Sequence, residues 1–383
     1  MRNFIAERRR NMPESKLIPI FDNATRYDDV INLSIGDPDV PTPRAIVDAM
    51  YQDALKGHTK YTNSWGEMEL REEIVKFYQE EYGVQLGVNE VFIAASGCLA
   101  MTEVMMAVLD PGDEVLLFDP YFTCYTSQIE EGLGVPVLVP SYENEDWQPN
   151  MERAAQYLTA RTKAILFTSP NNPTGAFYTQ KTLEQIAAFA QAHDLLVIAD
   201  DIYTAFCYDA PFLPIMTLPG MRERTVTVNS FSKNFIMTGF RLGNVVAPAP
   251  IAKAIKSVGE NIIYCPPSPS QRAALYALRH RKEIEATIKP EFAARVAYAR
   301  ARIQALPYMT VSAQGAGFYL FPGIAKTGLG SIAACNAFLD GAHVLMLPGA
   351  AFGDAGEGYM RIACTVDVET LGKAFDRLEK LKF

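Results

Sequence analysis

Short, almost continuous apolar runs alternate with longer amphipathic stretches through the middle of the chain. Runs of this kind are typical of strands that are covered on both faces. Five of them are predicted strands, at 91–95, 115–118, 164–167, 195–199 and 225–228. Helical spacing separates most of these runs, as it does at 183–192. The alternation predicts an α/β fold with a large, doubly wound, mostly parallel sheet.

The last third of the chain has a different pattern. Residues 270–306 form one long helical pattern with little interruption. Two short strand-like pieces follow, at 317–321 and 359–364, and a final helix is expected to end at Phe383. This order of elements predicts a smaller α+β domain.

A proline-rich stretch at 265–269 is a predicted hinge between the two parts. We therefore expect a large domain at 41–264. The small domain is expected to be made of both chain ends, 1–40 and 265–383.

Composition and charge exclude several classes of protein. The chain has 383 residues with 35 Lys+Arg and 44 Asp+Glu, which gives a net charge of −9. Its 49% apolar and 21% charged residues are ordinary globular values, so disorder over most of the chain is excluded. An acidic balance argues against nucleic-acid binding, and the basic run at 8–10 is interpreted as solvated or ion-paired. No apolar run approaches the roughly 18 residues of a membrane span.

Cysteines and histidines are scattered along the chain. The cysteines are Cys98, Cys124, Cys207, Cys265, Cys335 and Cys364. No C-x-x-C or H-x-x-x-H spacing occurs, so neither a metal site nor a redox motif is predicted. Widely spaced cysteines are typical of reduced thiols, and the N-terminus lacks the apolar run of a signal peptide. We expect a cytoplasmic protein.

Each predicted strand is directly followed by a loop that contains polar residues, glycine or proline. These loops are 96–98, 119–122, 168–175, 200–203 and 229–233. In a parallel sheet, such loops open on one edge, outside the carboxyl ends of the strands. That edge is where open α/β sheets bind ligands.

The loops bring together groups that suit a phosphate. Ser230, Lys233 and Arg241 supply a hydroxyl, an amine and a guanidinium, and Gly97 begins a helical pattern whose free N–H groups can face an anion. The sequence contains neither a P-loop nor a dinucleotide-binding signature, so a nucleotide is not indicated.

The same edge carries a second set of groups, which suits a flat, acid-paired ring. Asp200 supplies a carboxylate, Tyr203 a phenol and Phe122 a flat apolar face. With a lysine and a phosphate pocket, these groups fit pyridoxal phosphate, which requires a Schiff-base lysine and an acidic partner for its pyridinium nitrogen.

Six motifs follow one another at plausible spacings along the chain. In order they are Gly36-Asp37-Pro38, Tyr61 before Leu70-Arg71, Asn172-Pro173-Thr174-Gly175, Asp200 with Tyr203, Ser230-Phe231-Ser232-Lys233 with Gly239-Phe240-Arg241, and Tyr359-Met360-Arg361-Ile362. Each motif occurs by chance, but together they resemble the fold-type I pyridoxal-phosphate aminotransferases of class I/II. The resemblance covers nearly the whole chain.

The resemblance implies roles around the cofactor ring. Lys233 would carry the internal aldimine and shuttle a proton on the substrate. Asp200 would keep the pyridine nitrogen protonated. Tyr203 and Asn172 would bind the ring hydroxyl, and Phe122 would stack on the ring.

It also implies a phosphate site that is shared between two subunits. Ser230, Arg241 and the backbone of Gly97 and Cys98 would hold the phosphate. Tyr61 would reach the phosphate of a partner chain, so the resemblance implies a homodimer.

For the substrate, the resemblance implies that Arg361 grips the α-carboxylate, a bidentate task that lysine performs poorly. Asn172 and Gly36 would assist it. Two departures from the family pattern stand out. Ile236 replaces a small residue three positions after the lysine, and Cys98 stands where some acid-specific relatives carry lysine.

Taken singly, the same residues have ordinary explanations. A lysine after a strand is usually solvated, and Asp200 could cap a helix. Tyr203 could be a core aromatic residue. Arg241 and Arg361 stand among apolar neighbours and need a partner, which could be an internal carboxylate or a ligand.

Three functions are compatible with residues of this kind. The first is ping-pong transamination from a neutral or aromatic L-amino acid, with aspartate less favoured, to a 2-oxo acid such as 2-oxoglutarate or pyruvate. The second is a carbon–sulfur β-lyase acting on cystathionine-like substrates, which the motifs do not separate from the first. The third, a ligand-sensing domain without catalysis, is disfavoured because all the chemical groups are present and no length is left for a DNA-binding domain.

Overall fold

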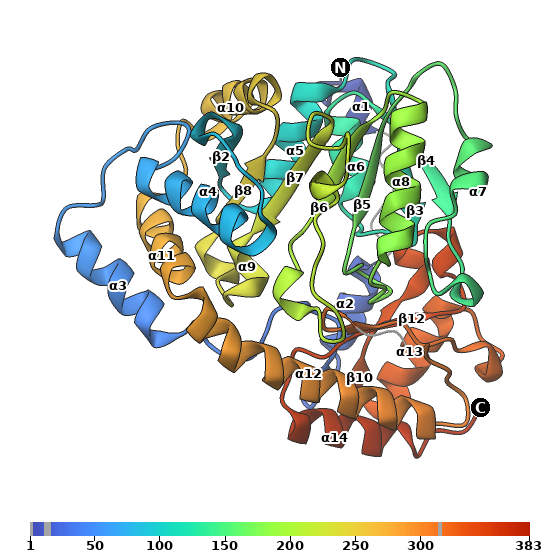
Figure 1. Cartoon of the computed structure of the whole chain (residues 1–383). Helices are drawn as coiled ribbons and strands as arrows, with labels where there is room; N and C mark the ends of the chain where they lie inside the picture. Colours follow the sequence, from blue (N-terminus) through green and yellow to red (C-terminus); the bar gives the residue numbers. More distant parts are fainter. Residues whose placement is uncertain (1–2, 11–16, 313–315) are drawn as a thin grey trace.

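The structure is a computed structural model that describes residues 3–10, 17–312 and 316–383. Its largest sheet has seven strands in the order β2-β8-β7-β6-β5-β3-β4 (Figure 1). The strands are β2 (Val91–Ala94), β3 (Glu114–Asp119), β4 (Val135–Pro140), β5 (Thr162–Thr168), β6 (Leu196–Asp200), β7 (Thr225–Ser230) and β8 (Gly243–Val246). Only β8 runs in the opposite direction to the other strands of this sheet. The predicted mostly parallel sheet is confirmed, and β4 and β8 are strands that the apolar runs did not indicate.

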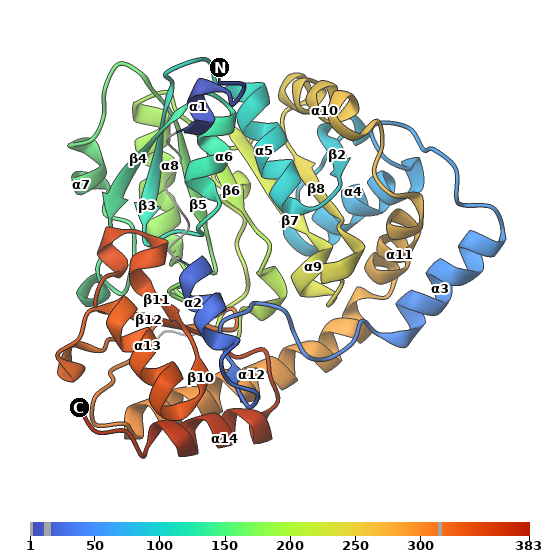
Figure 2. The same cartoon turned by 180° about the vertical axis from the view of Figure 1, so that it is seen from behind.

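Helices cover both faces of this sheet, as the two opposite views show (Figures 1 and 2). Side chains along a strand alternate between faces. In β3, Val115 and Leu117 belong to the cluster formed with α5 (Gly97–Val108) and α10 (Ala249–Ile263). Leu116 and Phe118 belong instead to the cluster formed with α8 (Gln180–Ala192). A strand buried on both faces needs apolar residues at every position, which explains its continuous apolar run.

Two small sheets lie beside the large one. β1 (Ile31–Asn32) pairs in parallel with β10 (Val344–Leu345), and β11 (Leu347–Pro348), β12 (Met360–Ala363) and β9 (Tyr319–Leu320) form an antiparallel sheet. Both chain ends therefore contribute to this region. The helices around it are α2 (Ile18–Ala24), α12 (Arg281–Ala305), α13 (Ser331–Ala342) and α14 (Val368–Leu378).

The remaining helices are α1 (Glu7–Arg10), α3 (Arg44–Leu55), α4 (Met68–Tyr82), α6 (Tyr125–Glu131), α7 (Met151–Ala155), α9 (Phe231–Asn234) and α11 (Ser268–Arg279). α11 lies beyond the predicted hinge but packs against α3 and α4. The division at residues 41 and 264 stays a prediction.

The expected single helix over 270–306 is wrong. The chain leaves helical geometry at His280, where φ is −112° and ψ is 19°, and this residue separates α11 from α12. The bend lets the buried Arg281 side chain donate to Glu80 and Glu81 on α4. Those partners lie about 200 residues earlier, so local periodicity could not reveal the break. The last helix ends at Leu378 and not at Phe383.

The structure bears on the basic run near the N-terminus and on the absence of a membrane span. Arg9 forms an ion pair with Glu131 of α6, as expected for part of the basic run. In the described parts of the chain, none of the helices combines the length and apolar character of a membrane span.

Candidate active site

A cavity of about 440 Å³ lies at the carboxyl ends of the parallel strands. Every predicted site residue except Tyr61 lines it, in the order Gly36, Gly97, Cys98, Phe122, Asn172, Asp200, Tyr203, Ser230, Lys233, Arg241 and Arg361. The volume is in the range of small-molecule sites. Residues from the large sheet and from both chain ends meet in it.

Lys233 enters the cavity from α9, the short helix that follows β7. Ser230 caps this helix, because its Oγ accepts the N–H of Ser232 at 3.1 Å. The Lys233 Nζ donates to the carbonyl oxygen of Gly36 at 2.5 Å. Burial lowers the pKa of Lys233 to about 8, although the nearby Asp37 carboxylate acts in the opposite direction. Much of this amine is therefore uncharged slightly above neutral pH, as a nucleophile or proton carrier requires.

The turn after Lys233 carries the unusual Ile236. Its φ is +54°, a conformation that is rare for a β-branched side chain. The carbonyl oxygen of Ile236 accepts a hydrogen bond from Thr42 Oγ1, and its side chain is buried. A side chain without a branched Cβ would adopt this backbone with less strain.

Asp200 is the last residue of β6, and it lines the wall of the cavity. Its Oδ2 accepts a hydrogen bond from the hydroxyl of Tyr125 at 2.6 Å, and its backbone oxygen accepts one from Thr168. Oδ1 is buried and has no hydrogen-bond partner among the residues that the structure describes. Burial raises the pKa of Asp200 to about 7, and the Tyr125 hydrogen bond works against this rise. Oδ2 is thus held in place by a hydrogen bond, whereas Oδ1 is available to accept one.

Arg361 lies on β12 as a buried cation. Its Nη1 donates to Asn172 Oδ1 at 3.0 Å, and its Nη2 donates to the backbone oxygen of Ser34. Its guanidinium stacks over the rings of Tyr319 and Phe352 at 4.7 and 4.8 Å. Burial lowers the pKa of Arg361.

Among the described residues, no carboxylate forms an ion pair with Arg361, and its Nε has no partner. A buried charge without a counter-charge is costly. Of the two partners considered from the sequence, an internal carboxylate is not found beside Arg361 in the described parts of the chain. A ligand carboxylate would supply the counter-charge that Arg361 lacks.

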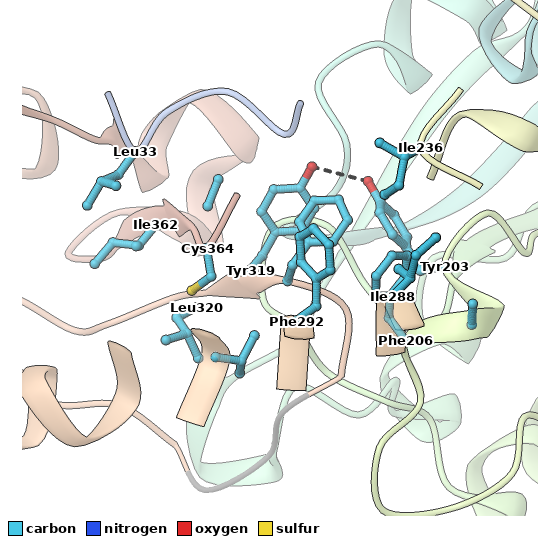
Figure 3. Packing of buried hydrophobic residues seen from close by; sticks show 14 of the residues in the cluster. Leu33, Tyr203, Phe206, Ile236, Ile288, Phe292, Tyr319, Leu320, Ile362 and Cys364 are labelled. Carbon is cyan, nitrogen blue, oxygen red and sulfur yellow. Dashed lines mark hydrogen bonds between the residues drawn. The ribbon is translucent and has the colours of Figure 1, made fainter. Parts of the chain in front are cut away.

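Tyr203 joins the two sides of the cavity. Its hydroxyl donates to the hydroxyl of Tyr319 at 3.2 Å, and the two rings point toward each other from different parts of the chain (Figure 3). A Cβ on Gly36 would lie 1.9 Å from the Tyr319 oxygen, so only glycine fits there. Tyr319 therefore lies among Tyr203, Gly36 and Arg361.

The first turn of α5 forms a cradle at the other end of the cavity. Its first N–H groups lack carbonyl partners within the helix. Ser96 caps the helix, with its Oγ accepting the N–H of Leu99 at 3.1 Å. Gly97 faces Ser230, since a Cβ on Gly97 would stand 3.2 Å from the Ser230 Cβ. Arg241 also lines the cavity, and its Nη1 donates to the Thr238 carbonyl at 2.8 Å.

Sequence reasoning missed Tyr125, Tyr319 and Gln128, all of which line the cavity. Tyr125 stands three positions after Phe122, and the two rings meet edge to face at 5.5 Å. That spacing at the start of a helix was an available signal. No local signal marked Tyr319, because its partners are distant in the sequence.

Tyr61 lies outside the cavity. Its side chain is 84% exposed and meets the ring of Tyr264 edge-on at 5.2 Å. Within a single chain it makes no contribution to the site, so its predicted role depends on a second subunit.

Comparisons with known proteins agree on one family. The sequence profile of aminotransferase class I and II matches residues 28–378. An aspartate aminotransferase of Pyrococcus abyssi is 38% identical over 371 residues, which cover 96% of this chain and 95% of that protein. An aromatic-amino-acid aminotransferase 2 of Thermococcus litoralis is 35% identical, with 98% of each chain covered. A crystal structure of an aromatic aminotransferase from Pyrococcus horikoshii superposes with a TM-score of 0.90 at 37% identity, covering 94% of this chain and 98% of that one.

Proposed function

The chain belongs to the aminotransferase class I and II family, and we propose that it uses pyridoxal phosphate to transfer amino groups from neutral or aromatic L-amino acids, in preference to aspartate, to 2-oxo acids. One observation carries the proposal. Lys233, Asp200 with its unpartnered Oδ1 and Arg361, which has no counter-charge among the described residues, all line one cavity. These are the groups that a cofactor aldehyde, a pyridinium nitrogen and a substrate carboxylate need.

The residues present fit the cofactor. The unpartnered, buried Oδ1 of Asp200 is suited to accept a hydrogen bond from a pyridinium N–H. Phe122 offers a flat apolar face in the same cavity, and Ser230 and Arg241 would hold a phosphate at the first turn of α5. When bound, pyridoxal phosphate supplies an electron-withdrawing ring that stabilises negative charge at the substrate Cα. The chain's own residues must supply the orientation and the proton transfers.

Lys233 is the proposed proton carrier. Its lowered pKa leaves part of the amine uncharged at neutral pH, and the Gly36 carbonyl orients Nζ through a hydrogen bond. Tyr203 and Asn172 are the proposed partners of the ring hydroxyl. Tyr203 also contacts Tyr319, and Asn172 contacts Arg361, the proposed carboxylate ligand. Movement of Lys233 away from Gly36 would let the amine reach the substrate Cα.

The walls of the cavity support a neutral or aromatic side chain. Leu17, Phe21, Leu347 and Phe352 line the cavity near Arg361 and belong to, or pack against, one apolar cluster. Within the described residues, the cations that line the cavity are Lys233, Arg241 and Arg361. Each of these already has a proposed partner, so none is left in this subunit for a side-chain carboxylate.

A homodimer is part of the proposal. Tyr61 is exposed together with Met68 and Tyr264, and apolar side chains such as Tyr51 and Leu55 on α3 are also exposed. Covering this surface with a second copy would bury them and bring Tyr61 to the partner's phosphate. We place the enzyme in the cytoplasm, which its six free cysteines support.

A half-reaction tests the chemistry. The purified enzyme, loaded with pyridoxal phosphate, is mixed with one amino acid at a time and without an oxo acid. We expect a change in cofactor absorbance and stoichiometric release of the matching 2-oxo acid, fastest with an aromatic or neutral donor. Lys233→Ala should lose nearly all turnover. Release of ammonia, pyruvate and a thiol from cystathionine without this conversion would refute transamination.

Mixed dimers test the shared site. The Tyr61→Phe and Lys233→Ala proteins are each expected to have low activity alone. After subunit exchange, one site of the mixed dimer combines an intact Lys233 with the intact Tyr61 of the other chain. Recovery of activity supports the shared site, and a fully active monomer in sedimentation would exclude it.

A further inference from the structure

Tyr319 is a buried tyrosine in the wall of the cavity. It lies on β9, beside β12, where its register partner is Ala363. Its hydroxyl meets that of Tyr203 at 3.2 Å, and the two rings face each other (Figure 3). The face of its ring lies against the Arg361 guanidinium, whose central carbon is 4.7 Å from the ring centroid. One side chain thus contacts both the proposed partner of the cofactor's ring hydroxyl and the proposed partner of the substrate carboxylate.

Close packing fixes the position of Tyr319 on several sides. A Cβ on Gly36 would lie 1.9 Å from its hydroxyl oxygen, and a Cβ on Gly175 would lie 2.5 Å from its carbonyl oxygen. The turn that ends at Gly175 also carries Asn172. The rings of Tyr203 and Tyr319 meet edge to face, with their centroids 5.7 Å apart. The hydroxyl oxygen therefore has little room to move away from Tyr203.

The two phenols can reverse the direction of their hydrogen bond. Tyr203 donates to Tyr319 in this structure, but a phenol has one proton to donate and can accept at the same time. Burial raises the pKa of both tyrosines, so each keeps its proton at neutral pH. When the oxygen of a bound ring accepts from Tyr203, the Tyr203 oxygen can accept from Tyr319 instead. Hydrogen bonds in such a chain strengthen one another, because each polarises the next.

We propose that Tyr319 is a positioning residue with two separate tasks, in which its hydroxyl directs the Tyr203 proton to the ring oxygen of pyridoxal phosphate and its ring holds Arg361 for the substrate carboxylate. The inference rests on the proposed function. Through Tyr203, the hydroxyl stabilises the anionic form of the ring oxygen, so the bound cofactor releases its proton at a lower pH. The electron-rich face of the ring attracts the guanidinium, a cation that has no carboxylate partner among the described residues.

The first experiment removes only the hydroxyl. Tyr319→Phe, loaded with pyridoxal phosphate, is titrated between pH 5 and 10 while the absorbance of the bound cofactor is followed. We expect the pH of its transition to rise by about half a unit, because Tyr203 donates less strongly without the Tyr319 hydroxyl. The other charged groups around the two phenols are Asp37, Asp200 and Arg361, and the substitution leaves all three in place. In a Tyr203→Phe background, the same substitution should add no further shift, because the hydroxyl acts through Tyr203.

The second experiment removes the ring. Tyr319→Leu and Tyr319→Met keep an apolar side chain but have no aromatic face for Arg361. The probe is 3-phenylpropionate, which is phenylalanine without its amino group, and its binding to the loaded protein is measured by calorimetry. We expect both variants to bind it about ten-fold more weakly than Tyr319→Phe, which should itself stay within about two-fold of the parent.

Tyr308→Phe is the matched control for the loss of a buried hydroxyl. Tyr308 is about as buried as Tyr319, its hydroxyl donates to the Leu378 carbonyl at 2.6 Å, and it is not among the residues that line the cavity. We expect this variant to be less stable than the parent in melting curves, with an unchanged cofactor transition and unchanged binding of 3-phenylpropionate.

The outcomes that contradict the two tasks differ. An unshifted cofactor transition in folded Tyr319→Phe, an equal shift in Tyr308→Phe, or a full further shift in the Tyr203→Phe background would overturn the role of the hydroxyl. Equal affinity of 3-phenylpropionate for Tyr319→Phe and for a folded variant without the ring would overturn the role of the ring. A parent protein that binds no pyridoxal phosphate would count against the proposed function instead, so the two failures are distinguishable.

Discussion

Replacing Tyr125 with phenylalanine tests how the cavity fixes its buried carboxylate. The change keeps the ring that packs against Phe122 and removes only the hydroxyl that donates to Asp200 at 2.6 Å. A hydrogen bond to an ionised group contributes about 1.5–3 kcal/mol, and one between neutral groups about 0.5–1.5 kcal/mol. The ionised form of Asp200 therefore loses about 1.4 kcal/mol more than the protonated form, which corresponds to about one pKa unit.

Because the ionised form of Asp200 loses more hydrogen-bond energy than the protonated form, the pKa of Asp200 should rise. Burial already raises the pKa of Asp200 to about 7, and the Tyr125 hydroxyl opposes that rise. In Tyr125→Phe, the pKa should move to about 8, because the opposing hydrogen bond is gone. At neutral pH, less of Asp200 is then ionised and able to pair with a pyridinium. We expect pyridoxal phosphate to bind about five-fold more weakly at pH 7, with kcat reduced and the acid limb of its pH profile moved upward by about one unit.

The assay is a titration of cofactor-free enzyme with pyridoxal phosphate between pH 6 and 9, with the melting temperature measured alongside. Tyr178→Phe is the matched control, because Tyr178 is equally buried but its raised pKa has burial as its only cause. A folded Tyr125→Phe protein whose affinity stays within two-fold of the parent, with an unshifted pH profile, would show that Tyr125 does not position Asp200.

Three further predictions follow from single contacts. Burial raises the pKa of Glu103 to about 8, and its carboxylate has no hydrogen-bond partner among the described residues. Folding therefore takes up a proton, and this group should lower the free energy of unfolding by about 1.4 kcal/mol per pH unit between its unfolded pKa and about pH 8. Glu103→Gln should remove this contribution in melting curves from pH 5 to 9. Arg361→Lys should lower kcat/KM by about 100-fold, because it loses bidentate geometry, and an unchanged KM would argue against carboxylate binding there. Gly36→Ala should destabilise the fold by about 1–3 kcal/mol by displacing Tyr319. Gly239→Ala, which meets no atom within 4 Å, should change chemical-denaturation stability by less than about 0.5 kcal/mol.

The sequence by itself determined the class of fold and most of the cavity. Strands buried on both faces need unbroken apolar runs, and a parallel sheet brings the loops after those runs to one edge. Lys233, Asp200 and Ser230 could therefore be grouped from their position directly after a strand. Tyr61 was the exception, and its role depends on a second chain that a single sequence cannot position.

Only the tertiary structure decided how the charges in the cavity are balanced. The hydrogen bond from Arg361 to Ser34 joins residues 327 positions apart, and no local pattern could show that this cation lacks a carboxylate partner among the described residues. The same holds for Tyr125, which reaches Asp200 across 75 positions, and for the break at His280. Periodicity reports which face of an element is buried, because burial repeats with the geometry of the backbone. Periodicity does not show which distant side chains are in contact. Those contacts depend on how the helices and strands pack and on the distances between them.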